Sequence, residues 1–154
     1  MRKGTQHKRV LAVSSGGGHW VELLRLAPAF EAVDVAYVTV QRDYGDDVGG
    51  RRFYVVNDAT RWNKLAVAMM ALRLLVIMMW ERPDVVITTG AAPGYFALRF
   101  GRWLGAKTVW LDSIANAEEL SMSGRIARRH ADLWLTQWSH LAERGGPEFA
   151  GAVL

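Results

Sequence analysis

The chain has 154 residues, 51% of them hydrophobic, and a formal net charge of +4. This length fits one ordinary domain with a sizeable core, and the apolar content excludes intrinsic disorder. The absence of cysteine excludes disulfides and thiolate metal sites. The apolar run that follows the polar first eight residues is too short for the core of a secretory signal, so we expect no such signal.

Basic residues gather in two clusters, and tryptophan is abundant. The clusters are Arg2, Lys3, Lys8 and Arg9 near the amino end, and Arg125, Arg128 and Arg129 further on. Such clusters suit phosphates, anionic lipid or nucleic acid, although a solvated surface explains each cluster taken singly equally well. The seven tryptophans favour interfaces with another protein or with lipid headgroups.

Short β-branched runs alternate with helical stretches, which predicts an α/β fold: a Rossmann-like parallel sheet with helices on both faces. The expected strands are residues 10–13, 35–40, 53–56, 84–88, 107–111 and 132–136. The expected helices are residues 19–30, 62–80, 93–104 and 123–130. The polar, glycine-rich residues 41–51 are expected to form a mobile loop. Without repeats or linkers, residues 1–154 are expected to form a single domain, with 139–154 as a C-terminal extension.

Two loops of small residues follow buried strands. One contains Gly16, Gly17 and Gly18, and the other contains Gly90 and Ala91. The N–H groups at a helix start attract anions, and glycine lets the backbone approach a ligand closely, although a tight turn explains the first loop alone equally well. Because the first and fourth strands of doubly wound sheets commonly lie side by side where strand order reverses, both loops should border one crevice. We therefore predict that these five residues bind phosphate groups.

A dinucleotide site is the obvious rival for the first loop. The spacing Gly16-x-Gly18-x-x-Val21 places valine where that fingerprint needs glycine or alanine, and Gln41 stands where an acidic residue should end the second strand. No Gly-Lys-Ser/Thr follows either loop, so a P-loop is excluded. His19, at the mouth of the first loop, is expected to donate to a phosphate or to act as a base; the alternative is a helix-start histidine that bonds a nearby carbonyl.

The helix expected after the third strand is almost continuously apolar from residue 65 to residue 80, with Arg73 as its single charge. Sixteen residues rise only about 24 Å, short of the roughly 30 Å core of a bilayer, so we do not expect this helix to span. It packs in the core of a parallel sheet or touches a membrane or a partner. We favour partial contact through Trp62, Met70, Arg73 and Met78.

Four parts of the chain resemble, in order, the acceptor subunit of the eukaryotic dolichyl-diphosphate N-acetylglucosaminyltransferase, its bacterial exopolysaccharide counterparts and the N-terminal half of MurG-like glycosyltransferases. These parts are residues 14–19 with 22–26, residues 82–90, residues 111–115 with Leu120, Ser121 and Gly124, and residues 131–133 with 136–138. The resemblance covers nearly the whole chain. It implies a GT-B glycosyltransferase divided between two proteins, of which this chain is the half that holds the acceptor.

The resemblance also implies how such a chain works. A separate catalytic subunit binds the UDP-sugar, and this chain holds a polyprenyl-diphosphate-linked saccharide through Gly17, Gly18 and His19. The transfer is inverting and uses no metal ion or cofactor, so a protein group takes the proton of the acceptor hydroxyl. His19 and Asp112 are the catalytic candidates, although Asp112 is one methylene shorter than the glutamate usual in the family. We expect no nucleic-acid partner.

Localisation and partnership follow from the same resemblance. Eukaryotic members open with a membrane-spanning helix that has no counterpart here, so we expect peripheral contact at the cytoplasmic face of the membrane. No residues remain for a second facing domain, so activity should require the partner, and the 139–154 extension is a candidate contact. One alternative is a non-catalytic membrane adaptor that recruits the catalytic subunit, and a weaker one is a free-standing nucleotide-binding domain.

Overall fold

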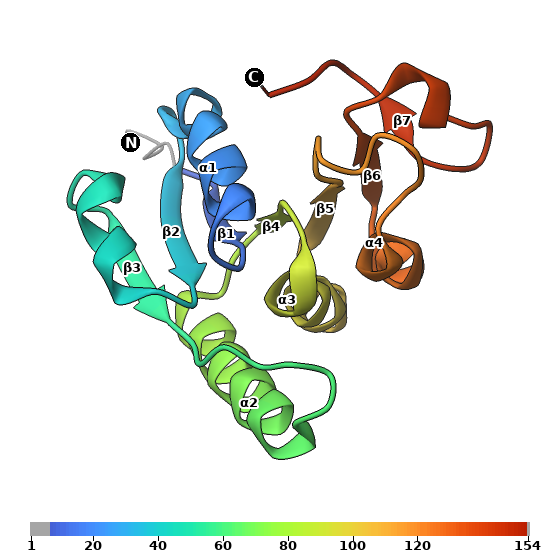
Figure 1. The fold of residues 1–154 in the computed structure, drawn as a ribbon. Coiled ribbons are helices and arrows are strands. Elements are labelled where there is room, and N and C mark those ends of the chain that lie inside the picture. Colours follow the sequence, from blue (N-terminus) through green and yellow to red (C-terminus); the bar gives the residue numbers. More distant parts are fainter. Residues whose placement is uncertain (1–6, 154) are drawn as a thin grey trace.

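Short strands rich in β-branched residues form one parallel sheet of seven strands in the computed structural model, which describes residues 7–153 (Figure 1). The strands are β1 Arg9–Val13, β2 Asp34–Thr39, β3 Arg52–Val55, β4 Val85–Thr88, β5 Lys107–Leu111, β6 Leu133–Thr136 and β7 Glu148–Phe149. Their order is β3-β2-β1-β4-β5-β6-β7, so it reverses between β1 and β4. The predicted Rossmann-like sheet, with the first and fourth strands adjacent, is confirmed.

Helices cover both faces of the sheet, as predicted (Figure 1). They are α1 Gly18–Arg25, α2 Lys64–Glu81, α3 Ala91–Trp103 and α4 Met122–Ala127, with 3-10 helices η1 Ala27–Phe30, η2 Arg42–Val48, η3 Arg128–His130 and η4 Ser139–Leu141. No helix within residues 7–153 is long and apolar enough to cross a bilayer. Of the two basic clusters, Arg2 and Lys3 lie outside the described residues.

The alternation of side chains along β1 divides the core into two clusters. Val10 and Ala12 pack on the side of α1, whereas Leu11 and Val13 pack on the opposite side, which α2 and α3 cover. Because successive side chains of a strand point to opposite faces, a strand covered on both faces must be apolar throughout. The continuous apolar run of β1 therefore follows from its central place in the sheet.

Two elements differ from the sequence predictions. The expected helix over 19–30 is divided, because Pro28 has no N–H for an α-helical bond and lies in η1. The segment expected to be a mobile loop forms η2, which packs on α1: Tyr44 stacks on Trp20 with ring centroids 5.1 Å apart, and Trp20 Nε1 donates to Asp47 at 2.9 Å. Composition does not reveal these tertiary contacts.

The C-terminal extension is part of the sheet, which sequence reasoning missed. It contributes β7, which pairs with β6, and then returns toward α1 (Figure 1). There Val153 N donates to Gln137 Oε1 at 2.8 Å, and the guanidinium of Arg25 donates to Val153 O at 3.1 Å. The extension therefore joins the edge of the sheet to the end of α1.

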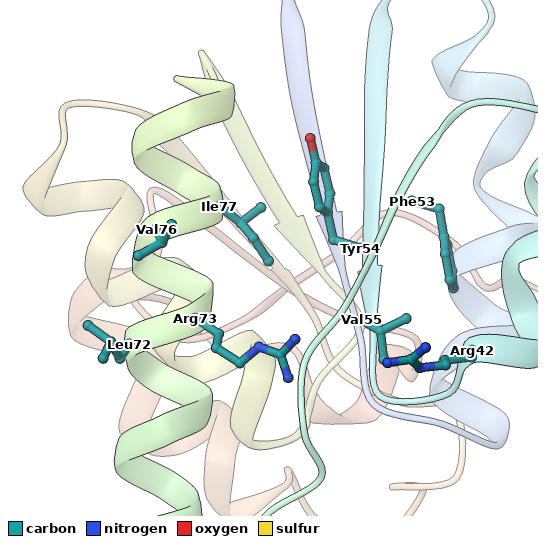
Figure 2. A pocket seen from close by; sticks show the side chains of 8 residues that line it. All are labelled: Arg42, Phe53, Tyr54, Val55, Leu72, Arg73, Val76 and Ile77. Carbon is teal, nitrogen blue, oxygen red and sulfur yellow. The ribbon is translucent and has the colours of Figure 1, made fainter.

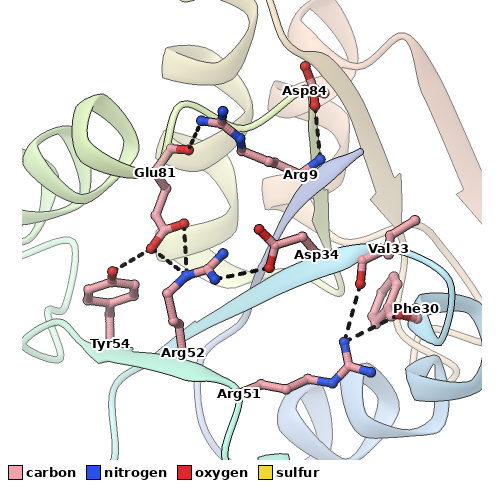
Figure 3. A network of polar contacts seen from close by, with 9 residues as sticks. All are labelled: Arg9, Phe30, Val33, Asp34, Arg51, Arg52, Tyr54, Glu81 and Asp84. Carbon is pink, nitrogen blue, oxygen red and sulfur yellow. Dashed lines mark hydrogen bonds and ion pairs between the residues drawn. The ribbon is translucent and has the colours of Figure 1, made fainter. Parts of the chain in front are cut away.

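A polar network anchors the last turn of α2 to the edge strand β3 (Figure 3). Glu81 is only 8% exposed and accepts hydrogen bonds from Arg52 Nε at 3.0 Å and from the hydroxyl of Tyr54. Arg52 also pairs with Asp34 of β2 at 3.0 Å. Burial, together with the hydrogen bond to Glu81, raises the pKa of Tyr54 to about 12, so this hydroxyl stays a donor at physiological pH.

Candidate functional site

The two predicted small-residue loops lie next to each other, because Val13 of β1 pairs with Thr88 of β4 and each loop begins just beyond this pair. His19 joins them: its Nδ1 lies 2.9 Å from the carbonyl oxygen of Thr89, and Thr89 Oγ1 donates to the backbone carbonyl of His19 at 2.6 Å. A Cβ added at Gly90 would lie 3.0 Å from His19 Cε1. Glycine is therefore needed where the second loop passes the imidazole ring.

The first loop leaves N–H groups of α1 available to a ligand. Gly17 precedes the helix at φ 65° and gives no side-chain cap. The first intrahelical bonds run from Trp20 N and Val21 N to Gly17 O, so the N–H groups of Gly18 and His19 have no acceptor within the helix. A Cβ added at Gly18 would meet nothing within 4 Å. An anion can therefore approach the positive end of α1.

The second loop holds a strained backbone at the start of α3. Gly90 has φ 129°, and Ala91 has φ 66°, a left-handed conformation that is costly for a residue with a Cβ. Gly90 N donates to Thr88 Oγ1 at 3.0 Å, and α3 also begins without a side-chain cap. Strain of this kind concentrates at ligand-binding loops. The predicted residues Gly16, Gly17, Gly18, Gly90 and Ala91 thus lie in two neighbouring loops at the carboxyl edge of the sheet.

The contacts of His19 determine which ring nitrogen is available for chemistry. A carbonyl oxygen only accepts hydrogen bonds, so Nδ1 must carry the proton toward Thr89 O. In the neutral ring, Nε2 is then the nitrogen with the lone pair. The structure accordingly shows the carbonyl bond that was the non-functional alternative for His19, and this bond leaves Nε2 as the ring nitrogen that does not contact Thr89.

Asp112, the second catalytic candidate, is enclosed rather than presented to the loops. It is 2% exposed. Its Oδ1 accepts from Trp110 Nε1 at 3.0 Å and from the Ser121 hydroxyl, and its Oδ2 accepts from Ser121 N at 2.9 Å and from Asn116 Nδ2 at 3.3 Å. A carboxylate with four donors from its own strand and loop is suited to holding that loop in place. The geometry therefore favours a structural role for Asp112, and its catalytic role stays a prediction.

A buried carboxylate that sequence reasoning did not single out lies on α1. Glu22 is 4% exposed, and its Oε1 accepts from Ile114 N at 2.8 Å, Ser113 Oγ at 3.2 Å and Gln137 Nε2 at 3.3 Å. Glu22 therefore links α1 to the loops after β5 and β6. Its place in the 22–26 segment that carries the family resemblance was the signal available in the sequence.

Two of the four residues expected at a membrane or partner surface are buried, which corrects that expectation. Met70 and Met78 are 0% exposed and face the sheet, whereas Trp62 is 81% exposed and Arg73 is also exposed. The outer side of α2 instead carries a row of exposed apolar side chains, here called the α2 stripe: Leu65, Met69, Leu72, Val76, Met79 and Trp80. An exposed apolar row of this length marks an interaction surface.

An apolar pocket of about 340 Å³ lies between α2, α3 and α4, next to the second loop. Its walls include Val67 of α2, Ala92 and Phe96 of α3, and Ile126 of α4, and Lys64 lies at the start of α2 beside it. Because Ala92 follows Ala91 directly, this pocket begins at the loop that His19 contacts.

Both the sequence and the fold of the chain are similar to those of known proteins. Residues 59–153 match the family described as "Oligosaccharide biosynthesis protein Alg14 like". The chain is 27% identical over 169 residues to the UDP-N-acetylglucosamine transferase subunit ALG14 of Eremothecium gossypii, covering 89% of this chain and 75% of that protein. It is 32% identical over 70 residues to the protein of the same name from Yarrowia lipolytica, covering 42% of this chain and 32% of that protein.

Solved structures show the same fold at low identity. MurG of Acinetobacter baumannii matches with a TM-score of 0.76 and 14% identity, covering 92% of this chain and 45% of that one. The UDP-N-acetylglucosamine 2-epimerase of Rickettsia bellii matches with a TM-score of 0.70 and 13% identity, covering 96% of this chain and 45% of that one. The chain thus spans less than half of each of these two proteins. With the family match, the conclusion on identity is direct: the chain belongs to the Alg14-like oligosaccharide biosynthesis family.

Proposed function

We propose that the chain is the acceptor-side subunit of a heteromeric, UDP-sugar-dependent glycosyltransferase that acts on a polyprenyl-diphosphate-linked saccharide in polysaccharide or oligosaccharide biosynthesis. One observation carries this proposal: two uncapped helix starts meet at His19, which contacts both loops. The names of the matched relatives, UDP-N-acetylglucosamine transferase subunits, supply the reaction class.

The acceptor diphosphate is assigned to the two loops. A diphosphate carries several negative charges, and the positive ends of α1 and α3 offer N–H donors without side-chain competition. Gly18 and His19 donate from α1, while Gly90 and Ala91 bring the start of α3 close. The apolar pocket beside Ala92 lies where the first isoprene units of the lipid would leave the diphosphate.

His19 is assigned as the base. In an inverting transfer the acceptor hydroxyl oxygen attacks C1 of the donor sugar, UDP leaves, and the hydroxyl proton passes to a protein group. His19 Nε2 is the nitrogen with the lone pair, and the bond from Nδ1 to Thr89 O stabilises the imidazolium that forms. Asp112 acts as a positioning residue, through the loop that its four hydrogen bonds hold.

The UDP-sugar is assigned to a separate catalytic subunit. Residues 7–153 form one sheet, whose carboxyl edge holds the two loops assigned to the acceptor. A sugar-nucleotide transferase of this architecture places donor and acceptor on two facing domains. Residues 139–153 are a candidate contact for that subunit, because they extend the sheet at β7 and cross to α1. Their hydrogen bonds to Gln137 and Arg25 give the surface a defined shape.

Peripheral contact with the cytoplasmic face of a membrane is assigned to α2, α3 and α4. These helices and η3 carry seven exposed cations: Lys64, Arg73, Arg99, Arg102, Arg125, Arg128 and Arg129. The one carboxylate within these four helices is Glu81, which is buried in its network with Arg52 and Tyr54. Two of the seven cations pair with carboxylates of adjoining loops: Arg102 with Asp132 at 3.5 Å and Arg125 with Glu119 at 2.8 Å. The other five, together with the apolar α2 stripe, are complementary to an anionic lipid surface.

Substitutions at the first loop test the acceptor site. In Gly18→Ala the added Cβ has free space and the backbone is not left-handed, so the free energy of unfolding should stay the same or rise by up to about 1 kcal/mol. The same Cβ stands where the phosphate approaches, so calorimetry should show geranyl diphosphate binding at least about tenfold weaker. Val21→Ala, on the exposed side of α1, is the control and should change neither quantity.

Replacing His19 separates catalysis from recruitment. His19→Gln should lower sugar transfer by the pair reconstituted with its catalytic subunit by about 10² to 10⁴-fold, the usual range for a general base. Recruitment of the catalytic subunit to membranes should be unchanged. Near wild-type transfer with intact recruitment would instead support the non-catalytic adaptor, and binding of UDP by the isolated chain would support the free-standing nucleotide-binding domain.

A further inference from the structure

A second cavity lies between the edge strand β3 and helix α2 (Figure 2). It is an open groove of about 650 Å³. Its apolar walls are Phe53 and Val55 of β3 and Leu72 and Val76 of α2. Because β3 pairs with β2 only, no further strand of residues 7–153 covers this side of the groove.

Two arginines give the groove its charge. Arg42 reaches it from η2 and Arg73 from α2, and Figure 2 shows both side chains pointing into the groove near Val55, from opposite sides. No carboxylate of residues 7–153 lies within 4.0 Å of either guanidinium, and no acidic side chain lines the groove. A phosphate in the groove would be complementary to both charges, and the planar guanidinium matches phosphate oxygens in pairs.

Two walls of the groove belong to the surface for which we propose membrane contact. Leu72 and Val76 belong to the α2 stripe and are 63% and 58% exposed. When an apolar helix face enters the boundary of a bilayer, arginines beside it extend to headgroup level and their stems lie along the apolar surface. Arg42 and Arg73 would then stand at the depth of lipid phosphates, while the walls face the upper part of the lipid chains.

We propose that the groove between β3 and α2 binds one anionic lipid of the bilayer. The lipid phosphate lies between Arg42 and Arg73, and the first carbons of an acyl chain pack on Val55, Leu72 and Val76. This inference rests on the proposed membrane contact of α2, but it does not depend on sugar transfer. It gives the subunit a defined lipid contact in addition to nonspecific attraction by its basic helices.

A soluble short-chain lipid tests the groove without a membrane. Dihexanoyl phosphatidylglycerol, titrated below its micelle concentration, should bind with a stoichiometry of one and shift the amide NMR signals of β3 and α2. Arg42→Gln and Arg73→Gln should each weaken this binding by about tenfold or more, and Arg73→Lys should restore only part of it. Arg144→Gln removes the same charge from an exposed position far along the chain and should leave the affinity within about twofold.

Two further ligands show whether the groove recognises the charge and the chain of the lipid, and one activity assay separates lipid binding from sugar transfer. Dihexanoyl phosphatidylcholine should bind more weakly, because its headgroup has no net charge, and inorganic phosphate should bind more weakly, because it lacks the chain. Equal affinity for phosphatidylcholine, or an unchanged affinity in both arginine variants, would overturn the site. Inorganic phosphate binding as tightly as phosphatidylglycerol would overturn the lipid assignment. Lost sugar transfer in His19→Gln with intact lipid binding keeps the two proposals distinct.

Discussion

His19 and Thr89, 70 residues apart, hold each other through two hydrogen bonds in opposite directions. The imidazole Nδ1 donates to the carbonyl of Thr89 at 2.9 Å, and the hydroxyl of Thr89 donates to the carbonyl of His19 at 2.6 Å. The pair fixes the start of α1 against the start of α3. Each bond constrains a different part of His19, one its ring and the other its backbone.

The hydrogen bond between His19 and the carbonyl of Thr89 predicts the tautomer of His19. At a pH where the ring is neutral, its ¹⁵N NMR spectrum should show a protonated Nδ1 and an unprotonated Nε2, because a carbonyl cannot donate to Nδ1. Thr89→Val removes one of the two bonds and should lower the free energy of unfolding by about 1 kcal/mol, whereas Thr89→Ser should restore most of the loss. The opposite tautomer would remove the argument for Nε2 as the base.

The two sides of α2 should respond in opposite ways to an introduced charge. Met69 and Met79 are 50% and 58% exposed on the α2 stripe, so Met69→Glu with Met79→Glu should release the protein from anionic vesicles in sedimentation and change the free energy of unfolding by less than about 1 kcal/mol. Met70→Glu with Met78→Glu places charges in the core and should prevent folding. Retention of the Met69/Met79 variant on vesicles would exclude the stripe as the membrane contact.

A methyl group at Gly124 should disturb the loop that Asp112 organises. A Cβ there would lie 2.7 Å from Asp112 Oδ1, 2.8 Å from Ser121 Oγ and 2.9 Å from Trp110 Nε1. We expect Gly124→Ala to lower the free energy of unfolding in a urea titration by about 1–3 kcal/mol, the usual cost of overpacking. Ser123→Ala, the neighbouring substitution, should cost less than about 1 kcal/mol.

Variants of the same loop can show whether Asp112 positions the loop or takes part in catalysis. In Asp112→Asn an amide NH₂ replaces an acceptor among four donors, so stability should fall by about 1–3 kcal/mol. If Asp112 only positions the loop, Gly124→Ala and Asp112→Asn should lower sugar transfer to a similar degree and leave its pH profile in place. A changed pH profile of sugar transfer in Asp112→Asn alone would instead support a direct catalytic role for Asp112.

His130 should make stability depend on pH. Burial, followed by repulsion from Arg99, Arg129 and Arg102, lowers the pKa of His130 below its usual 6.5. A lowered folded-state pKa means that the unfolded chain binds the proton more readily, so the contribution is complete above about pH 6.5 and is lost as the pH falls through that value toward the folded-state pKa. Between pH 7.5 and 5.5 the free energy of unfolding should therefore fall less in His130→Gln than in wild type, with His140→Gln as the matched control.

The sequence was sufficient for the strand order at the site, because the features that determine it are local. β1 is apolar and is followed by a glycine loop, and β4 is followed by Thr89 and Gly90. Each pattern marks a strand that must be buried and followed by a tight turn. Parallel strands with helical crossovers then permit few topologies. The adjacency of the two loops was therefore predictable before any contact was known.

The orientation of α2 was not predictable, because a helix that is apolar all round contains no signal for the face that it buries. Leu11 and Val13 of β1 select Met70 and Met78 as the buried side, and that choice depends on packing alone. The surroundings of Asp112 were not predictable for a related reason: four donors surround it only after the chain between β5 and β6 has folded back. Burial of a polar group is a tertiary property, so its type and spacing in the sequence do not reveal it.

The central position of β1 has a consequence for the order in which the chain folds. Its partner β2 follows soon after it in the chain. Its other partner, β4, pairs only when Val10 meets Val85, across a connection that contains β3 and α2. Closing a long connection carries an entropic cost that is paid before the contacts form, so such pairings tend to form late and slowly. The first three strands should therefore collapse before β4 pairs with β1. Until then, the apolar α2 is not yet packed against the complete sheet. During that interval the chain is most exposed to aggregation, and the ligand loops come together only in the final step.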